Sequence, residues 1–513
     1  MRIRYSGQLI GMIALWSIGI ALSGCRQQYT ETILEKKPIQ YTVVGEGQIT
    51  RGEEKGENNK TYTILKAEAA AGWMFKEWTG VGVGEEEKYE REIKIAAGTG
   101  KDITAEFIKR KWTYILYMAA DNELESNALR AVNELEGADW RGQDVSVLAL
   151  IDRHPGYDAT DGNWSGTRLY EIRYDKAGVN STILSDRLDC AVLGLRKNEE
   201  SELDMSKEYV LSGALEYAKG MYQAEQYGLI IWGHGSGWRG MGKDETGGGN
   251  AMKLSRLGQA VKDKGLSIIA FDTGFAGNME VFYELKDAGR YGIGSSGASP
   301  AEGWPYKTVF EKFLASGKNA EDFCSATVGA YKEKYSETAG ADITVCKLNK
   351  MGELFSAYEA LSKEVSETVV TRPIAAKVKA ILMSESKTYR DNTYPTDVYT
   401  DIKDSAEKLQ SRAAELTGDA GKQQRIRDKA AQVMQAVEQA SSGWIEGKGE
   451  AGHIGIYLAQ KETAEAEASA HDAAYVRGSG EADQCTMVKT SEWWVVQSSK
   501  DRSVLDKIYY QYR

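Results

Sequence analysis

Two side chains able to do acid–base chemistry stand directly after short apolar runs near the middle of the chain. His234 follows the run Tyr227–Trp232 closely. Asp272 follows the run Leu266–Phe271. Neither run alternates apolar and polar residues, as expected of strands buried on both faces of a parallel sheet. Because sites in open α/β sheets form at the carboxyl ends of parallel strands, we expect an imidazole and a carboxylate side by side at one sheet edge.

The loop around His234 is rich in glycine, with Gly233, Gly235 and Gly237 beside or near the imidazole. Glycines allow a substrate backbone to approach closely and leave backbone N–H groups uncovered. A histidine base next to such donors suits acyl transfer, in which a nucleophile attacks a carbonyl and an oxyanion is stabilised.

The stretch from Tyr227 to Gly297 resembles the clostripain family of cysteine peptidases, peptidase family C11. The resemblance is carried by W-G-H-G-S-G-W, by the strand ending in Phe-Asp and by the helix-like N-M-E-V-F-Y-E-L. It implies a caspase-like α/β/α sandwich with a mostly parallel central sheet, and His234 as the catalytic base. The family's second strand ends in Asp-Ala-Cys, whose cysteine is the nucleophile. This chain reads Asp-Thr-Gly there, so Gly274 holds the nucleophile position.

The resemblance also implies roles in substrate binding. Asp272 resembles the acid at the floor of the family's pocket for Arg or Lys, and Glu302 resembles its neighbour. Gly233 and Gly235 would supply the oxyanion donors. Asp272 equally suits the cap of a helix that starts near Gly277, and both roles are compatible. Some family members bind Ca²⁺, so the resemblance admits Ca²⁺ here, but the scattered cysteines and histidines predict no metal site and no other cofactor.

No cysteine in the sequence pattern replaces the missing nucleophile. Cys324 lies in a helix-like stretch and Cys346 in a strand-like one, where cysteine behaves as a buried hydrophobe. Cys190 and Cys485 are far from the motifs. The expected protein is therefore a pseudopeptidase that binds basic peptide segments, or a protein partner, without cutting them.

Two hydroxyls near strand ends, those of Thr273 and Ser295, are possible substitutes for the nucleophile. A hydroxyl starts from a far higher pKa than a thiol, and no acid that would orient His234 is recognisable. The alternative function is nevertheless an active Arg- or Lys-directed endopeptidase that uses such an unrecognised nucleophile.

The N-terminus has the pattern of a bacterial lipoprotein signal. Two arginines precede an apolar run from Leu9 to Leu22, and the sequence then reads Ser-Gly-Cys25. Leu-Ser-Gly-Cys resembles the lipobox, whose cysteine is lipidated and becomes the mature N-terminus. The run is short for a membrane-spanning helix. We expect a signal peptide over 1–24, a tether over 25–39, and an exported lipoprotein anchored to the bacterial cell envelope or surface.

Residues 40–110 have the short runs and turn residues of a small β module. Within them, Gly72–Gly80 resembles the divergent InlB B-repeat, a β module of bacterial surface proteins. Trp73, Phe75 and Trp78 suit either a ligand platform or the core of a domain too small to bury much else, and we favour the core.

Residues 111–513 fit the peptidase-like domain, with helical insertions in about 348–440. A formal net charge of −11 disfavours nucleic acid as a partner, because an acidic surface repels phosphates. The expected strands are Trp112–Ala120, Val145–Ile151, Leu169–Tyr174 at an edge, Tyr291–Ser296, Ile343–Leu348 and Gly455–Leu458, and the expected helices are Leu124–Leu135, Leu211–Tyr222, Leu348–Glu367 and Ala406–Ala440.

Overall fold

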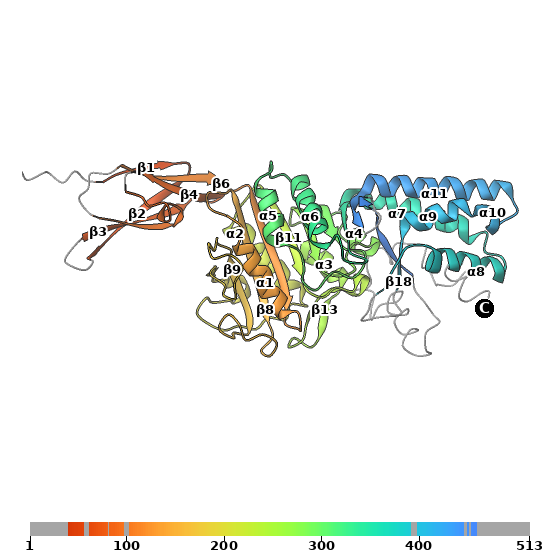
Figure 1. Cartoon of the computed structure of the whole chain (residues 1–513), viewed down its shortest axis with the longest axis horizontal. Coiled ribbons are helices and arrows are strands. Elements are labelled where there is room, and N and C mark those ends of the chain that lie inside the picture. The colour runs from red at the N-terminus through yellow and green to blue at the C-terminus, as the bar shows by residue number, and fades with distance from the viewer. Residues whose placement is uncertain are drawn as a thin grey trace, which may run out of the picture.

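The computed structural model describes residues 39–55, 61–80, 82–96, 102–390, 398–445, 449–450 and 453–458. The molecule is elongated, with β1–β6 at one end, an α/β part in the middle and a helical region at the other end (Figure 1). The expected signal peptide, the expected tether up to residue 38 with Cys25, and also Cys485 lie outside the described residues. Ile39, the last residue of the expected tether, is buried in the core of the N-terminal part. Within these ranges, every helix is too short or too polar to span a bilayer.

The N-terminal part consists of two three-stranded sheets that enclose one small core. The orders are β1–β6–β4 and β2–β3–β5. Their strands are β1 (Gln40–Val44), β2 (Gly47–Lys55), β3 (Thr61–Ala69), β4 (Trp73–Gly80), β5 (Glu92–Ala96) and β6 (Asp102–Lys109). The core between the sheets is formed by aliphatic side chains of β3, β5 and β6 together with Trp78.

The three aromatic residues of β4 belong to this core. Trp78 is buried, while Trp73 and Phe75 pack against the same cluster. The pairing of β4 with β6 shifts between Phe75 and Glu77, which inserts one extra residue into β4. Such a bulge changes which side chains face inward, and this explains why the aromatic residues alternate imperfectly in the sequence.

The central sheet has ten strands in the described part of the chain. The five inner strands, β8–β7–β11–β14–β15, are parallel, and the strands outside them run antiparallel. In spatial order the sheet contains β10 (Asp186–Arg187), β9 (Gly166–Glu171), β8 (Val145–Arg153), β7 (Trp112–Ala120), β11 (Gln226–Trp232), β14 (Leu266–Asp272), β15 (Gly289–Gly294), β16 (Asp342–Lys347), β19 (Ser441–Ile445) and β20 (Gly449–Glu450).

Helices cover both faces of this sheet. The side chains of β7 alternate between two cores: Tyr114 and Leu116 belong to one, Ile115 and Tyr117 to the other. The first core is closed by α1 (Glu125–Glu136), α5 (Tyr306–Leu314) and α6 (Ala320–Tyr335), and the second by α2 (Glu208–Met221), α3 (Leu254–Val261), α4 (Met279–Glu284) and α7 (Met351–Ser366). The expected α/β/α sandwich is therefore confirmed, with its parallel strands at the centre of the sheet.

The order of the parallel strands reverses between β7 and β11. The chain passes from β7 to β8 on one side, and later returns to place β11 on the other side of β7. The connection after β7 contains α1, which belongs to one core, and the connection after β11 contains α3, which belongs to the other. Such a switch point opens a crevice at the carboxyl ends of the strands, which is where α/β proteins bind ligands.

The structure corrects two of the expected elements and confirms a third. The expected edge strand β9 has β10 outside it. The strand expected over Gly455–Leu458 is confirmed as β21, which pairs with β18 (Val398–Asp401) in a separate small sheet. In the helical region, the single helix expected over 406–440 is three helices. The first ends at Ser411 and the second at Leu416, before Thr417, whose backbone is extended, and Asp419 caps the third through the Lys422 N–H.

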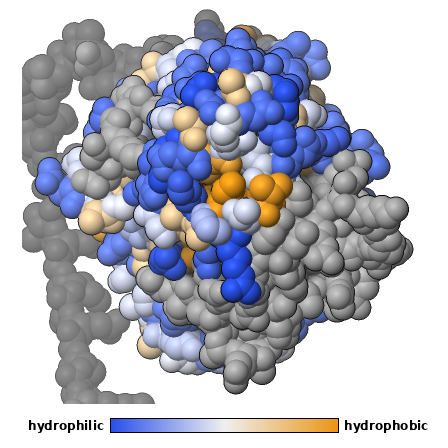
Figure 2. Space-filling view, turned by 90° about the vertical axis from the view of Figure 1, so that its right-hand side faces the viewer, coloured by the Kyte–Doolittle hydropathy of each residue, from blue (hydrophilic) through white to orange (hydrophobic). Residues whose placement is uncertain are grey.

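The helices of this region are α8 (Arg372–Ala380), α9 (Ile402–Ser411), α10 (Ala413–Leu416) and α11 (Ala420–Ala440), and its sheet contains β17 (Thr388–Arg390), β18 (Val398–Asp401) and β21 (Gly455–Leu458). Seen end-on, the described surface of this region is mostly hydrophilic around a small apolar spot (Figure 2).

Candidate functional site

The ends of β11 and β14 bring His234 and Asp272 together. The two strands are parallel neighbours, with Trp232 opposite Asp272 in their register. Asp272 is the last residue of β14, and His234 is the second residue after β11. A pocket of about 210 Å³ lies between these strand ends, and its lining includes His234, Asp272, Thr273, Gly274 and Ser299.

The loops that carry His234 and Gly274 are in close contact. A Cβ added to Gly235 would lie 2.5 Å from the Gly274 carbonyl oxygen, so only glycine fits at Gly235. Gly233 has a φ of +134°, and a Cβ there would lie 2.7 Å from the Ala119 carbonyl oxygen. The two glycines beside His234 therefore permit the close approach of neighbouring backbone.

Only one of the two expected oxyanion donors remains available in this geometry. The Gly233 N–H donates to the Asp272 carbonyl at 3.4 Å, so its expected role as an oxyanion donor is corrected. Gly235 faces Met241 in an isolated antiparallel bridge. The hydrogen bonds of this bridge are made by residues on either side, Ser236 to Gly240 and Gly242 to His234. The Gly235 N–H is therefore not used by the bridge.

His234 has an acidic neighbour that the sequence analysis missed. Glu123 Oε1 lies 3.1 Å from His234 Nε2, and about a third of the His234 side chain is exposed. Glu123 follows β7 in the loop at the switch point. The only sequence signal for this contact is the rule that loops after neighbouring parallel strands meet at one edge. Glu123 is thus the carboxylate placed to interact with the imidazole when it is protonated.

The structure leaves space for a Cβ atom at Gly274. Its φ lies outside the left-handed region. An added Cβ would meet Gly235 O at 3.4 Å, and Ala298 Cα and Ser299 N at 3.6 Å, which are ordinary contact distances. The position expected to hold the nucleophile therefore faces the His234 loop and the pocket.

No cysteine in the described part of the chain lines this pocket. Cys190, Cys324 and Cys346 are buried elsewhere, and burial raises the pKa of each of the three thiols. A buried thiol with a raised pKa is a poor nucleophile, as the sequence analysis expected.

The hydroxyl groups near the pocket differ from the expected set. Ser295 donates to the Asp342 carbonyl at 2.7 Å and does not line the pocket, so its expected approach to His234 is wrong. Thr273 does line the pocket, and its hydroxyl lies 3.4 Å from the sulfur of Met241. Ser299, which the sequence analysis missed, also lines it and donates to the Thr273 carbonyl at 3.0 Å.

Asp272 is a buried acid at the wall of the pocket. Its Oδ2 accepts two hydrogen bonds of 2.9 Å, one from the backbone N–H of Trp304 and one from the Tyr306 hydroxyl. Neither of these bonds involves Oδ1. Burial raises the pKa of Asp272 to about 6. The N-cap position of helix α4 is Asn278, which makes no side-chain cap bond, and Asp272 accepts its bonds from Trp304 and Tyr306, so the interpretation of Asp272 as a helix cap is wrong.

Glu302 does not stand beside Asp272 in the pocket. It is exposed, and only its backbone carbonyl makes a described bond, with Arg130. The pocket lining contains the residues on either side, Ala301 and Gly303, but not Glu302. The expectation that Glu302 joins Asp272 in holding a basic side chain is therefore corrected.

The sequence is similar to those of known proteins. The profile of the clostripain family, peptidase family C11, matches residues 116–493. Clostripain of Hathewaya histolytica is 26% identical in an alignment 259 residues long, which covers 44% of this chain and 46% of that relative. The match thus spans less than half the length of that relative.

Two solved structures are also similar. One is an inactive zymogen of a C11 protease from Parabacteroides distasonis, with 19% identity and a TM-score of 0.48 over 68% of this chain and 92% of that one. The other is a secreted C11 cysteine protease from Bacteroides thetaiotaomicron in complex with an irreversible peptide inhibitor, with 20% identity and a TM-score of 0.47 over 73% and 99% of the two chains. Because the family profile covers most of the sequence, this chain belongs to the clostripain family.

Proposed function

We propose that this protein is a clostripain-family pseudopeptidase that binds basic segments of a peptide or protein partner without cutting them. The observation that carries the proposal is Gly274. Its Cβ position opens toward the His234 loop, at the place where the resemblance puts the nucleophile, and no side chain stands there. An acyl-enzyme cannot form on a residue that has no side-chain nucleophile.

Asp272 supports a basic ligand. It is the acid at the pocket wall, and its Oδ1 is not used by the donors from Trp304 and Tyr306. A carboxylate with a pKa of about 6 is mostly ionised at neutral pH. An ionised carboxylate in the wall of a small pocket is a suitable partner for a lysine or arginine side chain, and such charge-assisted bonds are stronger than neutral ones.

The proposal includes attachment of the protein to a membrane. A lipid on Cys25 would anchor the chain, and residues 40–110, read as an InlB-repeat-like module, would separate the pocket from the membrane. Charged pairs between this module and the peptidase-like part support a fixed spacing. They are Arg91–Glu171 at 2.5 Å, Arg173–Glu90 at 2.8 Å and Lys176–Glu86 at 2.6 Å.

A second candidate function is an active Arg- or Lys-directed endopeptidase with a hydroxyl nucleophile. The observation in its favour is that Thr273 and Ser299 both line the pocket that contains His234. The observation against it is that each hydroxyl is directed at a nearby acceptor, the sulfur of Met241 or the Thr273 carbonyl.

One set of measurements separates the two candidates. The full chain is incubated with Arg and Lys ester and amide substrates and with thiol-directed peptide inhibitors, and binding of a fluorescent Lys-rich peptide is followed by anisotropy. The pseudopeptidase predicts peptide binding without cleavage or labelling. Cleavage that disappears in His234→Ala would instead establish the peptidase, and Thr273→Val and Ser299→Ala would then identify the hydroxyl.

A further inference from the structure

One edge strand of the N-terminal module is exposed along its whole length. Strand β1 pairs with β6 on one side and is the last strand of its three-stranded sheet (Figure 1). All five of its residues are exposed, so no described element covers its other side, which we call the β1 edge. An edge strand presents a row of unpaired backbone N–H and C=O groups, and these groups are a template for another strand.

The exposed side chains of β1 include three large apolar ones. They are Tyr41, Val43 and Val44, with exposed fractions of 37%, 39% and 48%. In the described part of the chain, no other stretch of five residues contains three exposed large apolar side chains. An apolar group of this kind on the surface indicates a contact with another molecule.

Two of these side chains continue the buried face of the sheet. In the register of β1 with β6, Tyr41 is opposite Ile103. Val43 is opposite Ala105, and both of these β6 residues are buried in the core of the module. Residues that stand opposite each other in paired strands lie on the same face. The core face of the sheet therefore extends to β1, where it is exposed to solvent.

The other edges of the module have features that oppose pairing with a further strand. The edge strand β4 contains a bulge and the adjacent charged residues Lys76 and Glu77. The two edge strands of the second sheet, β2 and β5, both carry acidic and basic residues. Charged side chains and bulges are the means by which proteins prevent edge-to-edge association. Strand β1 has neither, because its sequence is Gln-Tyr-Thr-Val-Val and its register with β6 is regular.

The sequence of β1 is complementary to itself in an antiparallel arrangement. A twofold axis at Thr42 places Thr42 opposite the same residue of a second copy. Tyr41 is then opposite Val43, and Gln40 is opposite Val44. Pairs of an aromatic with a β-branched residue, and of two threonines, stabilise antiparallel strands. The strand contains no charge, so two chains that each have a net charge of −11 bring no like charges together along it.

We propose that the β1 edge pairs with the β1 edge of a second copy of this chain, as antiparallel strands related by a twofold axis at Thr42. The two three-stranded sheets then become one continuous sheet across the dimer. Tyr41 and Val43 of both copies lie together on the core face and cover one another. An isologous contact of this kind, with the same surface on both subunits, closes after two copies.

The proposed dimer is weak and leaves the pocket beside His234 free. Strand β1 belongs to the end of the molecule that precedes the α/β part, whereas the pocket lies at the ends of β11 and β14 (Figure 1). Two strands of five residues form a small contact, and interfaces that bury less than about 1,200 Å² in total are weak and transient. The lipid anchor proposed above would favour the dimer, because attachment to one membrane raises the effective concentration of the two copies.

Charge variants at Thr42 test the proposal in the full chain. Sedimentation velocity is measured from low micromolar to near-millimolar protein, and the sedimentation coefficient of the wild type should rise with concentration. Thr42→Lys and Thr42→Glu each place two like charges opposite each other, so each should weaken the dimer about fivefold. An equimolar mixture of the two variants should dimerise again, because lysine then faces glutamate. This rescue is specific to a strand pair with residue 42 on the twofold axis.

Disulfide crosslinking gives an independent readout. Opposite Cα atoms of antiparallel strands lie about 4.5–5.5 Å apart, within the range that a disulfide spans, so mild oxidation should link two copies of Thr42→Cys. Thr50→Cys is the matched control, because Thr50 is also exposed and lies on the charged edge strand β2. Thr42→Cys should form the linked dimer about tenfold faster, since pairing raises the local concentration of the two thiols. Both variants also carry Cys25→Ser and Cys485→Ser.

Three outcomes would overturn the proposal. The first is a Thr42→Cys protein that crosslinks no faster than Thr50→Cys. The second is a wild-type dimer that both charge variants leave unchanged, which would place the contact on another surface. The third is a mixture of Thr42→Lys and Thr42→Glu that dimerises no better than either variant alone, as expected of a β1 edge that pairs with a strand of a different protein. Should a charged variant unfold the module, the crosslinking rate of Thr42→Cys decides alone.

Discussion

The Cβ position of Gly274 lies 3.4 Å from the carbonyl oxygen of Gly235, the residue directly after His234. The backbone at Gly274 is one that any residue adopts, since its φ is not in the left-handed region. What this position lacks is therefore a side chain, and the surrounding loops leave room for its Cβ atom.

Gly274→Cys should therefore create a reactive thiol in a folded protein. We expect a change in the free energy of unfolding within about 1 kcal/mol, because Gly274 needs no special φ and its new contacts are ordinary ones. A peptide inhibitor with a thiol-directed group after Lys or Arg should label the variant and leave the wild type unlabelled. Mass spectrometry of the intact protein measures the label.

Three variants control this experiment. Gly274→Ala adds the Cβ without sulfur and should fold without being labelled. His234→Ala in the Gly274→Cys background should slow labelling, because the imidazole no longer favours the thiolate. Gly277→Cys should be strongly destabilised, since its Cβ would lie 2.7 Å from the Ser296 nitrogen. A Gly274→Cys protein that reacts with small thiol reagents but never with the peptide inhibitor would contradict the proposed site.

Trp78→Ala tests whether the aromatic residues of β4 are a core or a ligand surface. Trp78 is buried, and its indole N–H donates to the Glu90 carbonyl at 2.8 Å. Loss of a buried tryptophan costs about 3–5 kcal/mol, so the N-terminal module should unfold at a lower temperature and become sensitive to proteases. Binding of basic peptides should not change. A stable variant that no longer binds its ligand would instead favour the platform.

Cys25→Ser tests the proposed lipid anchor. Because the sequence before Cys25 resembles a lipobox, the variant should remain unprocessed or leave the membrane fraction. A diacyl anchor carries two chains, which is enough for stable attachment. Fractionation of cells, with the gel mobility of the mature chain, measures the outcome. Unchanged fractionation and mobility of Cys25→Ser would contradict the lipid anchor.

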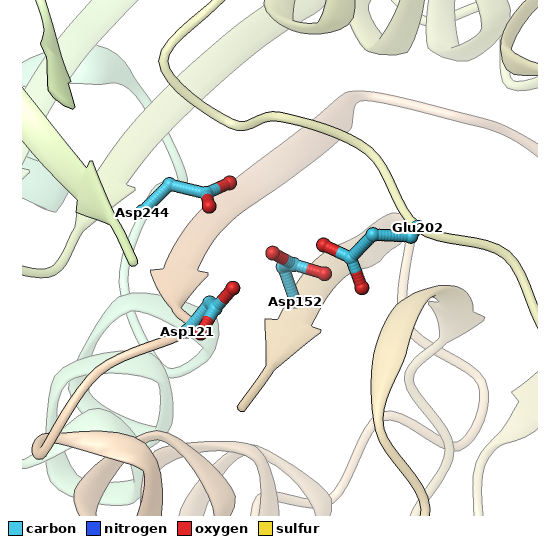
Figure 3. Close-up of side chains that lie close together, drawn as sticks. All are labelled: Asp121, Asp152, Glu202 and Asp244. Carbon is cyan, nitrogen blue, oxygen red and sulfur yellow. The ribbon is translucent and has the colours of Figure 1, made fainter. Parts of the chain in front are cut away.

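The rule that sites form at the carboxyl ends of parallel strands predicted that His234 and Asp272 belong to one site. His234 and Asp272 follow two apolar runs that read as neighbouring parallel strands, and the structure joins them. The same rule applies to Asp121 and Asp152, because Asp121 directly follows β7 and Asp152 is the next-to-last residue of β8. The sequence analysis did not predict that Asp121 and Asp152 lie close to Glu202 and Asp244 (Figure 3). Glu202 comes from a connection and Asp244 from a hairpin, and the sequence periodicity does not determine the position of either.

The errors in the predicted site come from side-chain direction in loops. Ser295 and Glu302 are near the site residues in the sequence. The Ser295 hydroxyl donates to the Asp342 carbonyl, and Glu302 is exposed to solvent. Alternation sets which face a strand residue occupies. After a strand ends, the direction depends on long-range partners, such as Asp342, which is 47 residues beyond Ser295.

Asp272 should give stability and ligand binding opposite pH dependences. Its pKa is raised to about 6 from an ordinary 3.8, so the folded state binds a proton more tightly than the unfolded state. The proton on Asp272 stabilises the folded state by roughly 3 kcal/mol, because the group is buried. This stabilisation is complete below about pH 4 and is lost as the pH rises through 6. A basic peptide needs the ionised form, so its affinity should rise over the same interval.

Asp272→Asn separates this effect from other titrations. The asparagine carbonyl still accepts the bond from Trp304, but no charge remains, so the variant should bind the Lys-rich peptide more weakly by about 1–3 kcal/mol at pH 7.5. Its affinity should also lose the rise near pH 6. Glu302→Gln is the matched control, because this exposed carboxylate lies outside the pocket lining and should leave both properties unchanged. Wild-type affinity that is constant between pH 5 and 8 would exclude Asp272 as the partner of the basic side chain.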